Sequence, residues 1–202
     1  MLARLPTAAL FGTVAWLRGR HRALHPNGDA YEAEVELGPD APAPLGPSRT
    51  VAAIARLSRG GGLPAPLPDV HGVAVKLPSL HGPGHDQDLL FATTWRRHVL
   101  RPVRRFEHVE HSTILPFELP GGRRVVFGAL PDGEGRFALA SAPVLGDWGE
   151  PWGELRLGRR LPAVVAEELR FDPFATAPGL RLSGPFSELR RPAYRASQAV
   201  RR

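Results

Sequence analysis

The chain has 202 residues, 43% of them hydrophobic and 23% charged, so it is long enough to bury one core and too apolar to be disordered throughout. It contains no cysteine, which excludes disulfides and any thiolate metal site. The formal net charge is +6, but Lys76 is the only lysine among 26 basic residues and no basic run alternates with aromatic residues. A nucleic-acid partner is therefore not expected.

The first 17 residues, from Met1 to Leu17, are moderately apolar. This run is too short to cross a bilayer, and no small-residue cleavage site follows Leu17. We interpret it as a soluble helix. We therefore expect no membrane span, a cytoplasmic protein, and a single domain over residues 1–202.

Two stretches in the first third of the chain predict strands. Residues 31–37 alternate between apolar and acidic side chains, which is typical of a strand with one buried face. A connector rich in proline, alanine and glycine follows over residues 38–48, and Thr50 to Ser58 predicts a second, buried strand. The triple glycine at 60–62 has no Gly-Lys-Ser/Thr after it, so a nucleotide-binding loop is not predicted.

The histidines of the central region give no metal-ligand spacing. His81 and His85 lie in a loop rich in glycine and proline and are interpreted as solvated. Residues 95–110 are rich in arginine and predict a helical connection with a charged solvent face. We assign to that solvent-facing region His98, His108 and His111.

The second half of the chain predicts strands separated by Pro-Gly-Gly and Pro-Asp-Gly turns. The expected strands cover residues 113–119, 124–130, 136–144, 154–157 and 163–169. With the earlier strands they make about eight, which favours a closed antiparallel β-barrel. Such a barrel is about wide enough to fill itself or to accept part of one ligand. The expected fold class is α+β, with helices at both ends of the chain.

The C-terminal segment places a charged residue near one of the two tyrosines. Arg190 stands four residues before Tyr194, a spacing that brings both side chains to one helical face if the helix begins between Arg190 and Pro192. A phenol has an ordinary pKa near ~10, so a tyrosine that binds ferric iron needs a fixed positive charge beside it.

The same segment resembles the haem-ligand region of catalases, where Asp-Pro and Pro-Gly precede an Arg-x-x-x-Tyr-x-x-(Ser/Thr)-Gln helix. The residues that carry the resemblance are Phe171, Asp172, Pro173, Pro178, Gly179, Arg190, Tyr194, Ser197 and Gln198. The resemblance implies that Tyr194 is the tyrosinate ligand of the iron of haem b, with Arg190 holding it ionised.

Earlier segments match the same family in the same order. Catalases carry a distal histidine before a glycine turn and a strand, and His25-Pro-Asn-Gly28 resembles this region. They also carry Arg-Phe-Ser at a strand end, which Arg56-Leu-Ser58 resembles, and Asp-x-Arg-Gly-x-Ala-x-Lys, which residues 69–76 resemble. By this resemblance Arg56 pairs with a haem propionate, and Ser58 orients the ring of His25.

Three positions depart from the catalase pattern. His71 and Glu118 stand where arginine is usual, and Ala92 stands where an asparagine helps to bind peroxide. The hydroxyl of Thr93 is a conceivable substitute for that amide. The resemblance therefore implies a haem peroxidase that reduces hydrogen or organic peroxides with little catalase activity. The alternative is a degenerate barrel that binds haem or an apolar small molecule without turnover.

Overall fold

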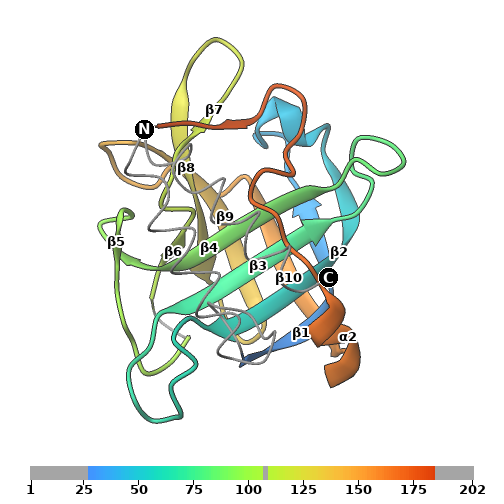
Figure 1. The fold of residues 1–202 in the computed structure, drawn as a ribbon. Coiled ribbons are helices and arrows are strands. Elements are labelled where there is room, and N and C mark those ends of the chain that lie inside the picture. Colours follow the sequence, from blue (N-terminus) through green and yellow to red (C-terminus); the bar gives the residue numbers. More distant parts are fainter. Residues whose placement is uncertain (1–26, 107–108, 185–202) are drawn as a thin grey trace, which may run out of the picture.

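The structure is a computed structural model, and it describes residues 27–106 and 109–184. Eight strands in this part of the chain form a closed antiparallel β-barrel (Figure 1). They are β1 (Asn27–Leu37), β2 (Arg49–Arg59), β3 (His71–Leu77), β4 (Gln87–Trp95), β6 (His111–Ser112), β8 (Arg124–Pro131), β9 (Arg136–Pro143) and β10 (Gly153–Arg160).

The barrel strands follow one another around the wall in chain order. Each pairs antiparallel with the next, β8 pairs with β9, and β10 returns to pair with β1, which leaves the barrel without an open edge. Three short strands lie off this path: β5 (Val99–Leu100) pairs with β4, β7 (Phe117–Glu118) with β8, and β11 (Arg181–Leu182) with β7.

The inside of the barrel is a packed core. Along β2 and β3 the odd-numbered side chains face inward, among them Ala55 and Val75, and both are fully buried. Phe127 of β8 stacks on Phe117 at a centroid distance of 5.0 Å and meets Trp152 edge-on at 5.7 Å. Eight strands enclose about the width that such side chains fill. Of the polar residues singled out in the sequence, Arg56 and Ser58 lie on the outer face of the wall.

The expected barrel is confirmed, but the described residues are not α+β. They contain one 3-10 turn, η1 (Ala43–Leu45), and one six-residue helix, α2 (Ala163–Glu168). The helices expected at the two ends of the chain fall on residues outside the described ranges. In the described ranges no helix is long and apolar enough to cross a bilayer.

The prediction of a strand over residues 163–169 is wrong, because this segment forms α2. Pro162 precedes the helix and fixes a backbone angle suited to a helix start. The prediction rested on four consecutive apolar residues, which are typical of a buried strand. In α2, however, only Ala166 is buried, and Val164 is 62% exposed. A short apolar run does not by itself distinguish a strand from a helix.

The expected strand over residues 113–119 is interrupted. β6 ends at Ser112 and β7 begins at Phe117, and between them Ile114 has a φ of 63°, which a β-branched residue in a continuous strand does not adopt. The expected helix over residues 95–110 is also wrong in the described part. Arg96 and Arg97 adopt φ values of 50° and 63° in a turn that leads into β5.

Candidate functional site on the outer face of the barrel

Arg56 and Ser58 both point outward from β2, because the odd-numbered side chains of this strand enter the core. They lie two residues apart on one face, and both are buried, with exposed fractions of 4% and 5%. An outward-facing arginine on a barrel strand is ordinarily solvated, so this burial is unusual. The structure therefore brings these two of the predicted site residues to one place.

The strand register extends this place into a row of small residues that curves around the barrel wall. Consecutive members pair across neighbouring strands from β1 to β8, and the row consists of Gly28, Ser58, Gly72, Ala92, Ser112 and Gly128. We call it the small-residue row. A parallel row two residues along contains Arg56, paired with Ala30 on one side and with Ala74 on the other. A buried guanidinium thus lies beside this row, and the Trp148 ring covers its Gly128 end, where a Cβ would lie 2.6 Å from the indole.

Gly28 shows how closely the chain approaches Ser58 as it enters β1. A Cβ at Gly28 would lie 2.4 Å from the carbonyl oxygen of Leu57 and 2.7 Å from the Cβ of Ser58, so no larger residue fits. The Ser58 hydroxyl donates to the Gly72 carbonyl at 3.5 Å, the limit of a hydrogen bond. His25 precedes Gly28 by three positions in the sequence. His25, Arg190 and Tyr194 lie outside the described residues.

Thr93, suggested as a substitute for the missing amide, lies on the inner face of β4 with Leu89 and Phe91, opposite to the outer face that carries Arg56 and Ser58 on β2. Its hydroxyl donates to the Arg101 carbonyl at 2.7 Å and accepts from the His71 backbone N–H at 3.1 Å. Ala92 is its outward-facing neighbour and presents only a methyl group to the small-residue row. Ser112 lies next in that row and accepts a hydrogen bond from the Thr94 hydroxyl at 3.2 Å.

The glycine-rich loop after β2 is organised by one carboxylate. Asp69 accepts backbone hydrogen bonds from Gly61 at 2.8 Å, Leu63 at 3.0 Å and Val70 at 2.7 Å, and Arg59 lies 3.8 Å away. Burial alone would raise the pKa of Asp69, but these amides and the Arg59 charge outweigh it and hold the pKa below its ordinary value. The backbone amides of Gly61 and Leu63 in this loop thus donate to Asp69.

Replacing Asp69 with alanine is expected to lower the free energy of unfolding by about 2–3 kcal/mol, because three partly buried N–H groups lose their acceptor. Chemical denaturation at neutral pH measures this loss. Asp69→Asn keeps one acceptor oxygen and should lose less. Equal stability of Asp69→Ala and the wild type would contradict the role of Asp69 in the loop.

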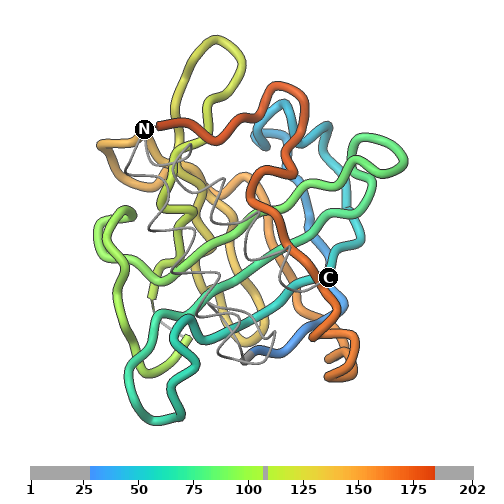
Figure 2. Tube along the Cα trace, viewed as in Figure 1, coloured from blue at the N-terminus to red at the C-terminus, as the bar shows by residue number. Residues whose placement is uncertain are grey.

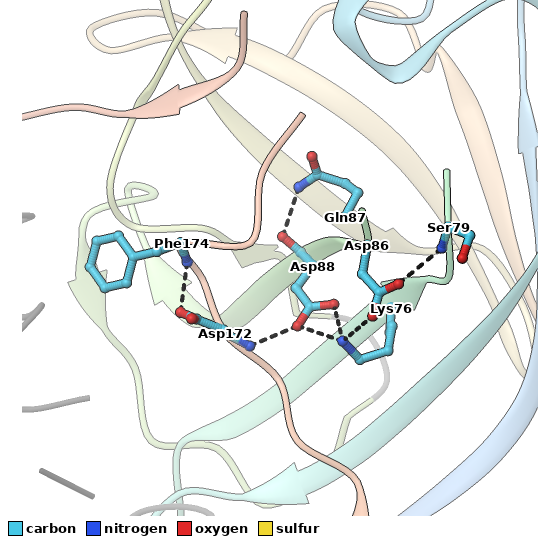
Figure 3. A network of polar contacts seen from close by, with 7 residues as sticks. All are labelled: Lys76, Ser79, Asp86, Gln87, Asp88, Asp172 and Phe174. Atoms are coloured by element: carbon cyan, nitrogen blue, oxygen red, sulfur yellow. Dashed lines mark hydrogen bonds and ion pairs between the residues drawn. The ribbon is translucent and has the colours of Figure 1, made fainter. Parts of the chain in front are cut away.

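A second polar network, not predicted from the sequence, lies on the same outer face (Figure 3). Asp88 of β4 is fully buried, and Lys76 of β3 contacts its two carboxylate oxygens at 2.8 and 3.0 Å. Asp88 also accepts the backbone N–H of Asp172 at 2.7 Å. Gln87 lies on the inward side of β4 with Leu89 and Phe91, and it accepts the backbone N–H of Ala177 at 2.7 Å. The one feature of the sequence that could have pointed to this network is Lys76, the only lysine of the chain. It lies two positions along β3 from Ala74, the partner of Arg56.

The charged groups of this network change one another's pKa values. Burial raises the pKa of Asp88 to about 6, against the opposing effects of Lys76 and of the Asp172 N–H. Burial alone would lower the pKa of Lys76, but hydrogen bonds and charges from Asp88 and Asp86 raise it. At pH 7 the two groups therefore form an ion pair.

His111 is not on a solvent-facing helix, contrary to the prediction. It is fully buried and points into the barrel, between Phe106 at a centroid distance of 6.0 Å and Phe137 at 5.9 Å. His71 also contacts Phe106, with the two rings tilted by 31° at a centroid distance of 4.1 Å. Burial lowers the pKa of His111 to about 4, and the nearby His71 adds to this shift.

The described residues offer no group of three or more His, Cys, Asp or Glu side chains that could hold a metal ion. In comparisons with known proteins, no protein-family model and no curated protein matches the chain.

Proposed function

We propose that the protein binds haem b on the outer face of the barrel, over the small-residue row, and acts as a peroxidase on hydrogen or organic peroxides. One observation carries the proposal. Arg56 and Ser58, which the resemblance to catalases assigns to the haem site, share one face of β2 and are both buried. Outward-facing residues of a barrel strand are ordinarily exposed to solvent, so the burial of both residues does not follow from strand alternation alone.

The described residues fit a planar, dianionic group. A flat ring would pack on the part of the row between β2 and β4, because Ser58, Gly72 and Ala92 project little from the sheet. The planar guanidinium of Arg56 matches a propionate carboxylate with two parallel hydrogen bonds. The site would bind haem from outside the barrel, where the core residues do not compete for the same volume.

The remaining roles come from the resemblance. Tyr194 would supply the phenolate that ligates the iron, and Arg190 would stabilise its negative charge. When bound, haem supplies the oxidation–reduction chemistry with the peroxide. His25 would take a proton from the near oxygen of the peroxide and return it to the far oxygen, while Ser58 keeps the imidazole oriented.

Haemin titration of the purified protein tests the proposal. The wild type is expected to take up one haem equivalent and to show a tyrosinate absorption band that Tyr194→Phe removes. Arg56→Ala should weaken haem binding roughly tenfold or more, the effect of a lost charge-assisted hydrogen bond. Arg159→Ala is the matched control, since Arg159 forms an exposed pair with Glu32 on another part of the wall. Absence of stoichiometric haem uptake by the wild type would refute the proposal.

A second candidate is a haem-binding protein without turnover, and Ala92 favours it. The methyl group of Ala92 lies in the small-residue row, where the catalase resemblance expects an amide donor. The loss of one oriented donor costs roughly 2.7–4 kcal/mol of transition-state stabilisation in other enzymes. Peroxidase rates of the wild type and His25→Ala with hydrogen peroxide and an alkyl peroxide separate the two, and equal rates favour the binder.

A further inference from the structure

An exposed apolar patch lies at the hairpin that joins β4 to β5. Trp95 pairs with Val99 across this hairpin, so the two side chains share one face, and they are 56% and 53% exposed. Leu100, the next residue of β5, is 49% exposed. Single exposed apolar residues are ordinary on a protein surface, but a contiguous group indicates an interaction site. We call residues 95–101 the hairpin tip.

The loop between β9 and β10 lies beside the hairpin tip and adds a further apolar side chain (Figure 2). The ring nitrogens of His98 lie 2.9 Å from the Ile114 carbonyl oxygen and 2.9 Å from the Val144 carbonyl oxygen, so His98 connects the tip to this loop. Leu145 follows Val144 and is 92% exposed. Two segments that are distant in the sequence therefore present apolar side chains at one place.

Arginines surround these apolar side chains. The exposed arginines of this region are Arg96, Arg101, Arg104 and Arg105. Among the described residues no carboxylate forms an ion pair with any of them. The Arg96 guanidinium lies 4.9 Å from the centre of the Trp95 ring. Asp147 contacts the tip at 4.0 Å from Arg97, which is less exposed. The surface is therefore both apolar and positively charged.

The backbone at the hairpin tip is unfavourable for the residues that it carries. Arg96 and Arg97 adopt φ values of 50° and 63°, which lie in the left-handed region. Consecutive left-handed residues in a hairpin turn are ordinarily asparagine, aspartate or glycine, because a longer side chain costs free energy there. Strained residues of this kind concentrate at functional sites. The turn keeps arginine at a cost to stability, which indicates a use for the exposed charge of Arg96.

We propose that the hairpin tip and Leu145 form a docking surface for a membrane that contains anionic lipids. Tryptophan and leucine side chains enter the boundary between headgroups and acyl chains, and arginines near them bind the lipid phosphates. A bilayer accepts a side chain as exposed as Leu145 without a preformed pocket, whereas an acidic protein partner would need an apolar pocket of matching shape. Membrane docking goes beyond the proposed function and does not depend on haem.

Co-sedimentation with phosphatidylcholine vesicles, with and without phosphatidylserine, tests the charge requirement. The full chain is expected to bind the vesicles that contain phosphatidylserine, more weakly as the salt concentration rises, and to bind the neutral vesicles poorly. Arg96→Asn with Arg101→Gln should reduce the affinity roughly 25-fold, since each arginine near an anionic surface contributes about fivefold. Asparagine tolerates a positive φ, so chemical denaturation should show this variant to be at least as stable as the wild type.

Arg156→Gln with Arg159→Gln is the matched control. It removes the same net charge, but from exposed arginines of β10 that pair with neighbouring glutamates. β10 lies across the barrel from β4 in the order of the strands. Its affinity for the vesicles should stay within about twofold of the wild type, because charges far from the docking surface are screened by salt.

The apolar part of the surface is tested separately. Leu145→Ser should weaken vesicle binding roughly tenfold or more, because a leucine side chain is no longer transferred from water into the membrane interface. It should leave the free energy of unfolding unchanged, since Leu145 is almost fully exposed. Tryptophan fluorescence of the wild type should shift to shorter wavelength on the anionic vesicles, and Trp95→Phe should remove most of that shift.

Three outcomes would overturn the proposal. The first is wild-type binding that is equal for neutral and anionic vesicles, or absent from both. The second is an equal loss of affinity in the tip variant and in the β10 control, which would assign binding to the overall charge of +6. The third is binding to polyglutamate as strong as to vesicles with no effect of Leu145→Ser, which would assign the surface to an acidic macromolecule.

Discussion

Lys76→Met is expected to lower the free energy of unfolding by about 3 kcal/mol at neutral pH, because it leaves the buried Asp88 carboxylate without its counter-charge. Asp86 contacts the same ammonium at 3.2 Å but is partly exposed, so its own loss adds little. Chemical denaturation at about pH 8 and about pH 5 measures the effect. The loss should shrink at the lower pH, because protonated Asp88 no longer needs a cation.

The double variant Lys76→Met with Asp88→Asn is the control for this prediction. It removes both charges but keeps an acceptor for the backbone N–H of Asp172. Its stability should return to within about 1 kcal/mol of the wild type, as found when buried ion pairs are replaced by neutral groups. A double variant no more stable than Lys76→Met would show that the lost contacts of the lysine stem, and not the unpaired charge, cause the effect.

The second large effect is a pH dependence of stability that arises from His111. Its pKa falls from 6.5 to about 4 on folding, so the folded state favours the neutral ring. The contribution of His111 to stability is therefore full above pH 6.5 and is lost as the pH falls through about 4. With about 1.36 kcal/mol for each pKa unit, the loss amounts to about 3 kcal/mol.

His111→Phe isolates this contribution, because a phenyl ring can replace the imidazole between Phe106 and Phe137 and does not titrate. The difference in unfolding free energy between variant and wild type should move in favour of the variant by about 3 kcal/mol between pH 6.5 and about 4. His85→Ala, at an exposed loop histidine, is the control for the loss of a histidine outside the core. A pH-independent difference for His111→Phe would contradict the assignment.

The comparison with the wild type is essential because Asp88 acts in the opposite direction. Its pKa is raised from 3.8 to about 6, so its contribution to stability is full below pH 3.8 and is lost as the pH rises through about 6. The two groups titrate over overlapping ranges and partly cancel in the wild type. Only the difference between variant and wild type shows the His111 effect alone.

The predictions from sequence were most accurate where a single local pattern decides the structure. Alternation along residues 31–37 identified β1, and the turn residues around Gly133 separated β8 from β9. They were least accurate where a short apolar run can form either a strand or a helix. Val164 and Val165 are exposed on α2, although their β-branched side chains favour a strand.

The same holds for the candidate site, where local pattern predicted the position of some residues and not of others. Arg56 and Ser58 were chosen from a motif, and their shared face follows from the period of two in a strand. The motif alone gave no face to Thr93, and the register of β4 puts Thr93 on the inner face and its neighbour Ala92 on the outer face. His111 was assigned to solvent for a similar reason, since nothing local to it shows that it enters the barrel.

The amino-acid sequence by itself determined the alternation of β1, the turn between β8 and β9 and the absence of thiol chemistry, because these depend on residue type and on contacts close along the chain. It did not determine the strands themselves, since β3 and β4 were not predicted and residues 163–169 form α2. The tertiary structure alone decided that the barrel closes through β1 and β10, and that Lys76, Asp88 and Asp172 meet on its outer face. The physical reason is that Asp88 and Asp172 lie 84 positions apart. Their contact depends on strand register and burial, and neither is encoded by any short segment alone.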